Sequence, residues 1–226
     1  KGTAGRIPRG PRTQIHPMTV VTGVMCRSIR DICRYYDVTA GYDSRDPYSL
    51  PKVEGWEHHL GSYLKDLRGA RIAIVPDLGV AKVNPAVADM VREAGEFLAR
   101  DLGLQLVDLE LSFPGLGYEW ALGNLASLYA DLDGLWPGCR DDLTKEIAFG
   151  LGIAEKHYSL DMMARSETAR TAANEAVAAA FDQVDFIISA TNPDVAFAAE
   201  TYLNLEVAGE EAGPENNGAL TIPYNI

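Results

Sequence analysis

The sequence is short of the residue types on which several protein classes depend. Only three of its 226 residues are cysteines, Cys26, Cys33 and Cys139, and no two of them form a C-x-x-C pair. This odd, widely spaced set fits neither a disulfide framework nor a zinc knuckle, and it favours a reducing cytosol. Cys26 and Cys33 lie near one apolar helix stripe, so we expect them to be buried as small hydrophobic residues.

Positive charge and long apolar runs are also scarce. The 20 lysines and arginines stand against 32 acidic residues, and the resulting formal net charge of -12 disfavours direct binding to nucleic acid. No apolar run approaches the roughly 20 residues of a membrane span. The basic first residues, 1–12, lack the apolar core of a signal peptide. We therefore expect a cytoplasmic protein, without a membrane partner, that binds small molecules or other proteins.

A complete catalytic constellation is missing as well. No serine lies in a G-x-S-x-G or Gly/Ser-rich turn, and Ser189, at a predicted strand end, is interpreted as a cap or turn residue. The adjacent His58 and His59 would diverge by about 100° on a helix, so they lack the spacing of a metal site. Gly115 and Gly117 do not open a dinucleotide-binding frame and are interpreted as a turn. The residues alone predict no catalytic and no metal site.

What is present indicates an α/β protein. Residues 71–75 form a nearly continuous apolar run, typical of a strand covered on both faces. Asn84 as N-cap and Gly103 as terminator bound a predicted helix, and residues 104–111 predict a second strand. Together they make residues 67–111 a βαβ unit with a parallel, right-handed crossover. The expected fold class is α/β, a mixed sheet with this βαβ unit and helices on both of its faces.

The remaining segments are predicted from helix caps and charge. Ser28 is the expected N-cap of a helix that Gly41 ends, residues 185–190 predict another strand, and residues 207–218 predict an exposed acidic loop. Among the predicted helices with an apolar stripe, the first two have stripes that we expect to be buried. The first stripe consists of Ile29, Ile32, Cys33 and Tyr36, and the second of Val87, Met90, Val91, Ala94, Phe97 and Leu98.

Four phrases, taken in order, resemble the amidase signature family in the part that follows its catalytic serines. Residues 1–8 are similar to the family's G-L-K-P-T-x-G-R-x-P stretch, and residues 23–31 to its G-P-x-A-R-S-V-x-D helix entry. Residues 181–191 are similar to its F-D-x-L-I-x-P-T strand, and residues 220–225 to its F-T-x-P-x-N segment. The order and spacing of these phrases extend the resemblance over nearly the whole chain.

The resemblance implies an amide hydrolase that cleaves carbon–nitrogen bonds of a small-molecule amide through a Ser-Ser-Lys triad and without a cofactor. The triad belongs upstream of Lys1, so we expect no catalytic residue in this chain and no activity of the chain alone. Thr221 and Tyr224 fall where some members line the acyl pocket, and they are the predicted substrate-binding residues. Simple packing is the alternative role for both.

The resemblance also implies a partial domain that is incomplete at both ends. This partial amidase-like domain would span residues 1–226 and comprise a post-catalytic loop and helix (1–51), the βαβ unit (67–111), a helical region (118–183) and a strand with an acidic loop (185–226). A sheet cut in this way should leave an apolar face or edge uncovered. We therefore expect a homodimer, or pairing with the missing upstream segment.

Two other functions remain open. The acidic α/β character and the missing triad also suit a non-catalytic binding or assembly module. Within the family, an amidotransferase A-type subunit works with a tRNA-binding partner, although residues 2–9 look more like stand-alone amidases.

Overall fold

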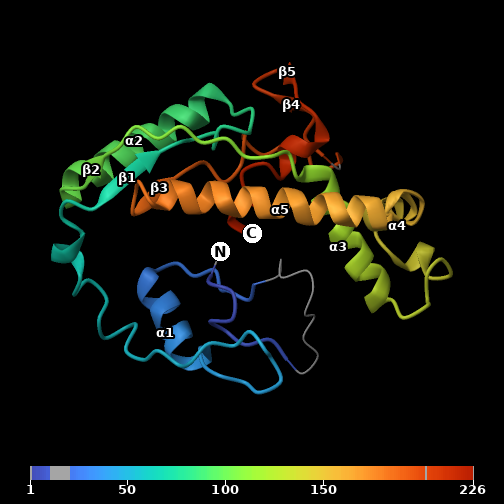
Figure 1. The fold of residues 1–226 in the computed structure, drawn as a ribbon, viewed down its shortest axis with the longest axis horizontal. Helices are drawn as coiled ribbons and strands as arrows, with labels where there is room; N and C mark the ends of the chain where they lie inside the picture. The colour runs from blue at the N-terminus through green and yellow to red at the C-terminus, as the bar shows by residue number, and fades with distance from the viewer. Residues whose placement is uncertain (1, 11–20, 202, 226) are drawn as a thin grey trace. The chain divides into compact units, whose positions relative to one another are not determined.

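The computed structural model describes residues 2–10, 21–201 and 203–225 (Figure 1). It divides into two compact units, Lys1–Arg68 together with Asn225, and Gly69–Tyr224. Each unit is described by itself. Within the described residues, no helix is long and apolar enough to span a membrane. The predicted subdivision of the chain into residues 1–51, 67–111, 118–183 and 185–226 stays a prediction.

The first unit contains one α-helix, α1 (Ile29–Thr39), and a single 3-10 turn, η1 (Leu64–Leu67), among its described residues. Ser28 caps α1 as expected, because its hydroxyl oxygen accepts a hydrogen bond from the Asp31 backbone N–H at 3.2 Å. The loop after α1 is fixed by Asp46, a buried carboxylate that accepts hydrogen bonds from the backbone N–H groups of Arg9 and Tyr48.

The expected burial of the α1 stripe is wrong. The helix has no buried residue, and Ile29 is 62% exposed. Cys26 is exposed and Cys33 half-buried, so the interpretation of these two cysteines as buried hydrophobic residues is also wrong. The physical reason is the lack of a partner: the described residues of this unit include no second α-helix and no sheet that could cover the stripe.

The second unit is built on a three-stranded parallel sheet with the order β2-β1-β3. Strand β1 (Arg71–Ile74) pairs with β2 (Gln105–Leu106) on one side and with β3 (Phe186–Ile188) on the other. Helix α2 (Pro85–Leu102) connects β1 to β2, which confirms the predicted βαβ unit. A separate antiparallel pair, β4 (Glu206–Val207) and β5 (Glu210–Glu211), lies near the C-terminus.

Two helices cover opposite faces of the parallel sheet (Figure 1). Successive side chains of a strand point to opposite faces. Ala73 packs with Ala180 of α5 (Leu160–Phe181), whereas the neighbouring Ile74 lies against Gly95 of α2. The α/β class with helices on both faces is therefore confirmed.

The second strand of the βαβ unit is shorter than residues 104–111. Its ladder consists of Gln105 and Leu106, followed by a hydrogen bond from the Val107 N–H to the Ile72 carbonyl at 2.9 Å. Beyond Val107 the chain leaves the ladder. Leu109 is buried in the apolar cluster of Ala73, and the partly buried Leu111 packs against the clusters of Ala73 and Leu78. The apolar side chains at positions 109 and 111 thus reflect packing against the core and not strand pairing.

Helix α2 begins and ends as predicted but turns a different face inward. Asn84 caps its first turn, and Gly103 ends it in the left-handed conformation at φ 68°. Its buried residues are the small ones, Ala88, Gly95 and Ala99, which let the helix backbone approach the sheet closely. The predicted stripe is therefore wrong for its largest members, because Met90, Phe97 and Leu98 are exposed.

The region between the strands is helical. It contains α3 (Gly117–Asp131), a 3-10 turn η2 (Arg140–Asp142), α4 (Lys145–His157) and α5. Leu122 of α3 and Ala154 of α4 share one apolar cluster, and Leu125 of α3 also packs against the cluster of Leu151. This packing joins α3 to α4.

The acidic segment near the C-terminus is folded, so the expectation of an exposed loop over residues 207–218 is wrong. It forms the β4–β5 pair and a 3-10 turn, η3 (Pro214–Asn217), and a further turn, η4 (Ile222–Asn225), follows. Val207, Ala212 and Asn216 are buried. The glutamates stay exposed while these residues between them turn inward, which a count of charges does not reveal.

Candidate functional site

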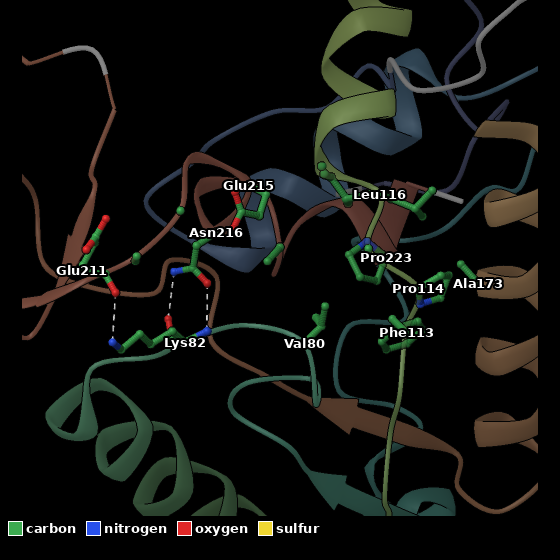
Figure 2. Close-up of a pocket in the computed structure, with 16 residues that line it drawn as sticks. Val80, Lys82, Phe113, Pro114, Leu116, Ala173, Glu211, Glu215, Asn216 and Pro223 are labelled. Carbon is green, nitrogen blue, oxygen red and sulfur yellow. Dashed lines mark hydrogen bonds between the residues drawn. The ribbon is translucent and has the colours of Figure 1, made fainter. Parts of the chain in front are cut away.

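One cavity of about 380 Å³ lies beside the C-terminal segment of the second unit (Figure 2). Four parts of the chain that are distant in sequence line it. These are the segment after β1 with Val80 and Lys82, residues 113–117 at the start of α3, Ala173 in α5, and residues 211–223 around η3. The volume falls within the roughly 300–1,000 Å³ of small-molecule sites.

One side of the cavity is apolar. Figure 2 shows Phe113, Pro114, Leu116, Ala173 and Pro223 gathered on this side. Leu116 and Ala173 belong to a buried cluster with Ile222, against which Phe113 packs. The wall is therefore part of the folded core of the unit and is held in place by it.

The other side is polar and is organised by Asn216. The buried Asn216 amide accepts a hydrogen bond from the Lys82 backbone N–H at 2.8 Å and donates one to the Lys82 carbonyl at 2.9 Å (Figure 2). These paired bonds join the segment after β1 to η3. They fix the backbone from which the Lys82 side chain extends.

The Lys82 ammonium group is held by strand β5. Its Nζ lies 2.7 Å from the Glu210 carboxylate and donates to the Glu211 carbonyl at 3.1 Å. The hydrogen bond and the charge of Lys82 lower the pKa of Glu210 below its ordinary value. The lysine at this end of the cavity is therefore already paired with an anion.

Asp194 ties the supporting segments together. Its carboxylate accepts hydrogen bonds from the Ala208 N–H, the Asn84 amide and the Val195 N–H, at 2.8, 2.7 and 2.7 Å. The Ala208 N–H makes the largest contribution to lowering the Asp194 pKa, followed by the Asn84 side chain. One carboxylate thus connects the segment after β3, the start of α2 and the β4–β5 turn.

We expect Asp194→Asn to weaken folding near neutral pH by about 1 kcal/mol, because it loses hydrogen bonds to a charged acceptor. Since folding lowers the Asp194 pKa, its contribution is present above the unfolded value of about 3.9 and is lost as the pH falls through the folded value. The variant should therefore lose less stability than the wild type below about pH 4. Urea unfolding across this pH range measures both effects.

Asp108→Asn is the matched control for this substitution. Asp108 is exposed and has no hydrogen bond among the described residues. An equal loss of stability in both variants would contradict the role given to Asp194.

The predicted substrate-binding residues lie next to the cavity and do not line it. Ile222 and Pro223 are lining residues, and Thr221 and Tyr224 flank them. The Thr221 hydroxyl donates to the Gly218 carbonyl at 3.2 Å. The structure also brings Tyr224 to Ser189 at the end of β3, with 2.7 Å between the two hydroxyl oxygens. Sequence reasoning named both residues but did not pair them.

No described serine is arranged as an activated nucleophile. Among residues 2–10, 21–201 and 203–225, no serine hydroxyl is hydrogen-bonded to a lysine or a histidine side chain. Ser28 and Ser159 cap helices, and the Ser127 hydroxyl donates to the Gly123 carbonyl. Within the same residues, no group of three or more His, Cys, Asp or Glu side chains has the geometry of a metal site.

Sequence reasoning missed the cavity itself. The sequence predicts a turn at Gly115 and Gly117, and no pattern in it marks Lys82 or Asn216. One signal is present, because Phe113, Pro114 and Gly115 just before α3 place flat and small surfaces side by side. Lys82 and Asn216 are 134 positions apart in the sequence, so no local pattern predicts that they pair.

A parallel βαβ sheet covered on both faces, with a small-molecule cavity beside it, defines an α/β protein with a ligand pocket. The amidase family model matches residues 1–226, and the chain belongs to this family. This confirms the resemblance to the amidase signature family.

Solved structures support the fold. A bacterial aryl acylamidase of the amidase signature family superposes with a TM-score of 0.80 and 24% identity, over 98% of this chain and 48% of that one. The native peptide amidase from Stenotrophomonas maltophilia superposes with a TM-score of 0.59 and 19% identity, over 97% of this chain and 48% of that one.

The sequence relatives are named as amidotransferase subunits, whereas the two solved structures above are named as amidases. The A-type subunit of glutamyl-tRNA(Gln) amidotransferase from Methanospirillum hungatei is 26% identical over 100% of this chain and 55% of its own length. The protein of the same name from Gluconobacter oxydans is 25% identical over 100% of this chain and 51% of its own length. The chain thus spans about half the length of these relatives.

Proposed function

We propose that this chain is the part of an amide hydrolase that binds the substrate, and that the cavity beside η3 is its pocket. One observation carries the proposal: a chain matched throughout by the amidase family model has a cavity of about 380 Å³ with an apolar wall and a polar end. Such a cavity suits one apolar group of a small-molecule amide, whose polar atoms meet the polar end.

The nucleophile, in this proposal, acts from a segment upstream of Lys1. The resemblance places the Ser-Ser-Lys triad there, and the arrangement of the described serines supports this assignment. We therefore expect the chain alone to be inactive and to require pairing with that upstream segment. A cytoplasmic location and a homodimer stay predictions.

Thr221 and Tyr224 are proposed to contact the substrate at the edge of the cavity. They lie on either side of the lining residues Ile222 and Pro223, and the Ser189 hydroxyl next to Tyr224 restricts where the phenol can point. A fixed phenol can hydrogen-bond to an amide group with a smaller loss of side-chain entropy.

Tyr224→Phe tests this contact in the protein that combines this segment with the upstream segment. We expect kcat/KM for amide hydrolysis to fall by about 3–10-fold, mainly through KM, because one neutral hydrogen bond to the substrate is lost. Initial rates over a range of substrate concentrations separate KM from kcat.

Tyr129→Phe is the matched control, because Tyr129 is 47% exposed and Tyr224 is 46% exposed. Tyr129 lies on α3 and does not line the cavity. Equal kinetics for wild type and Tyr224→Phe would remove Tyr224 from the binding site, and equal losses in both variants would point to folding instead.

An amidotransferase A-type subunit is the second candidate. The names of the sequence relatives favour it, since both curated relatives quoted above are A-type subunits of glutamyl-tRNA(Gln) amidotransferases. Ammonia release from free glutamine, together with no release of amine from neutral anilides, would support this candidate over the first.

A further inference from the structure

The charged residues that line the proposed substrate pocket are predominantly acidic. Glu211 and Glu215 both line the cavity, and Lys82 is its only cationic lining residue among those that the structure describes. The ammonium group of Lys82 is already paired, 2.7 Å from the Glu210 carboxylate. Two acidic residues therefore line the cavity, and Lys82 is paired with a third carboxylate, that of Glu210.

The amino end of a helix opposes the negative charge of the lining glutamates, but its effect is weaker. The amino end of α3, which carries a partial positive charge, opens at Gly117 on the cavity, and Leu116 provides no side-chain cap. Glu215 packs directly on this helix end, since a side-chain carbon added at Gly117 would lie 2.8 Å from its Cβ. Glu215 therefore covers this end of α3 with its Cβ and backbone, and its carboxylate lies beside Gly213.

The apolar side of the cavity defines the size of the group it accepts. An empty apolar cavity of about 150 Å³ is enough to hold a benzene ring. The present cavity measures about 380 Å³, and Phe113, Pro114 and Leu116 give it a flat, apolar wall. A substituted ring or a branched alkyl group of similar size fits this space.

We infer that the cavity selects amides whose enclosed group is apolar and either neutral or cationic, and that it rejects amides that carry a carboxylate. This inference rests on the proposed function and deepens it by naming the class of substrate. A carboxylate brought beside Glu211 or Glu215 loses hydration and meets like charge, whereas an ammonium group at the same place gains a nearby anion.

Binding of three matched probes to the 226-residue chain tests the inference without requiring catalysis. The probes are benzamide, para-(aminomethyl)benzamide and para-carboxybenzamide, which share one ring and differ in charge. Their dissociation constants are measured by titration, following amide signals in NMR spectra. We expect the cationic probe to bind at least about tenfold more tightly than the anionic one, with a gap that narrows as salt is added.

Charge variants then locate the source of the selectivity. The double variant Glu211→Gln/Glu215→Gln should reduce the gap between the cationic and anionic probes to less than about threefold. Glu93→Gln/Glu96→Gln changes the net charge equally on the exposed part of α2, outside the cavity, and should leave the gap intact.

A blocking variant shows whether the probes occupy this cavity. Gly115 lines the cavity, and a side chain added there meets no atom within 4 Å, so Gly115→Leu should fill the space without distorting the chain and abolish binding. Gly123→Leu introduces the same side chain at an equally open glycine of α3 that does not line the cavity, and should leave binding unchanged.

The outcomes separate this inference from the proposed function. Tighter binding of the anionic probe, no binding of any probe, or equal effects of the Gly115 and Gly123 variants would overturn the inference, while the hydrolytic function is judged by turnover alone. The expected probe order with no amide hydrolysis in the presence of the upstream segment would leave the selective cavity standing and contradict the proposed function.

Discussion

Gly79→Ala is expected to destabilise the second unit by about 2–5 kcal/mol, the largest loss we predict for a single methyl group. Gly79 has φ 66°, which costs about 1–2 kcal/mol for a residue with a Cβ. A Cβ at this position would also overlap the Leu111 carbonyl oxygen. That oxygen belongs to the backbone, so two segments would have to separate. Denaturant unfolding of wild type and variant measures the loss.

Gly69→Ala isolates the steric part of this effect. Gly69 has φ 80° and no atom within 4 Å of an added Cβ, so the substitution should cost only the backbone strain of about 1–2 kcal/mol. Equal losses at both glycines would show that the contact between Gly79 and Leu111 contributes nothing.

Gly79→Ala should also disturb the cavity. Gly79 lies in the turn that leads from β1 to the lining residues Val80 and Lys82. Displacing this turn moves the backbone that Asn216 holds by two hydrogen bonds. Weaker binding of the cationic probe by Gly79→Ala than by Gly69→Ala is therefore expected.

Local chemistry predicted where α1 begins and where α2 begins and ends. The caps by Ser28 and Asn84 and the terminator Gly103 act through hydrogen bonds and backbone angles within a few residues, so the sequence contains all the information needed. The βαβ unit followed from the same signals combined with the handedness of crossovers.

The face that a helix buries was not predictable in this way. Apolar size suggested that Phe97 and Met90 of α2 face the core, but the close approach of Gly95 to Ile74 turns the small residues inward. The outcome depends on which element packs against the helix. That partner is distant in sequence, so periodicity alone does not identify it.

The cavity escaped prediction for the same reason. It exists because Asn216 holds the backbone of Lys82 and because Ala173 of α5 meets Leu116 and Ile222. Thr221 and Tyr224 follow from the family resemblance, and they lie beside the lining residues Ile222 and Pro223.

The second large effect concerns turnover itself. If the substrate pocket lies in this chain and the nucleophile in the upstream segment, neither part completes a reaction alone, because hydrolysis needs the bound amide and the activated serine within about 3–3.5 Å of each other. Activity should then rise from background to a measurable rate when both are present.

The most direct test follows hydrolysis of para-nitroacetanilide, a neutral aryl amide, by the release of para-nitroaniline. The account predicts no release above background with this chain alone and steady release once the upstream segment is added. Hydrolysis by this chain alone that is abolished by Ser189→Ala would contradict it, because the nucleophile would then lie among the residues to which we assign binding only.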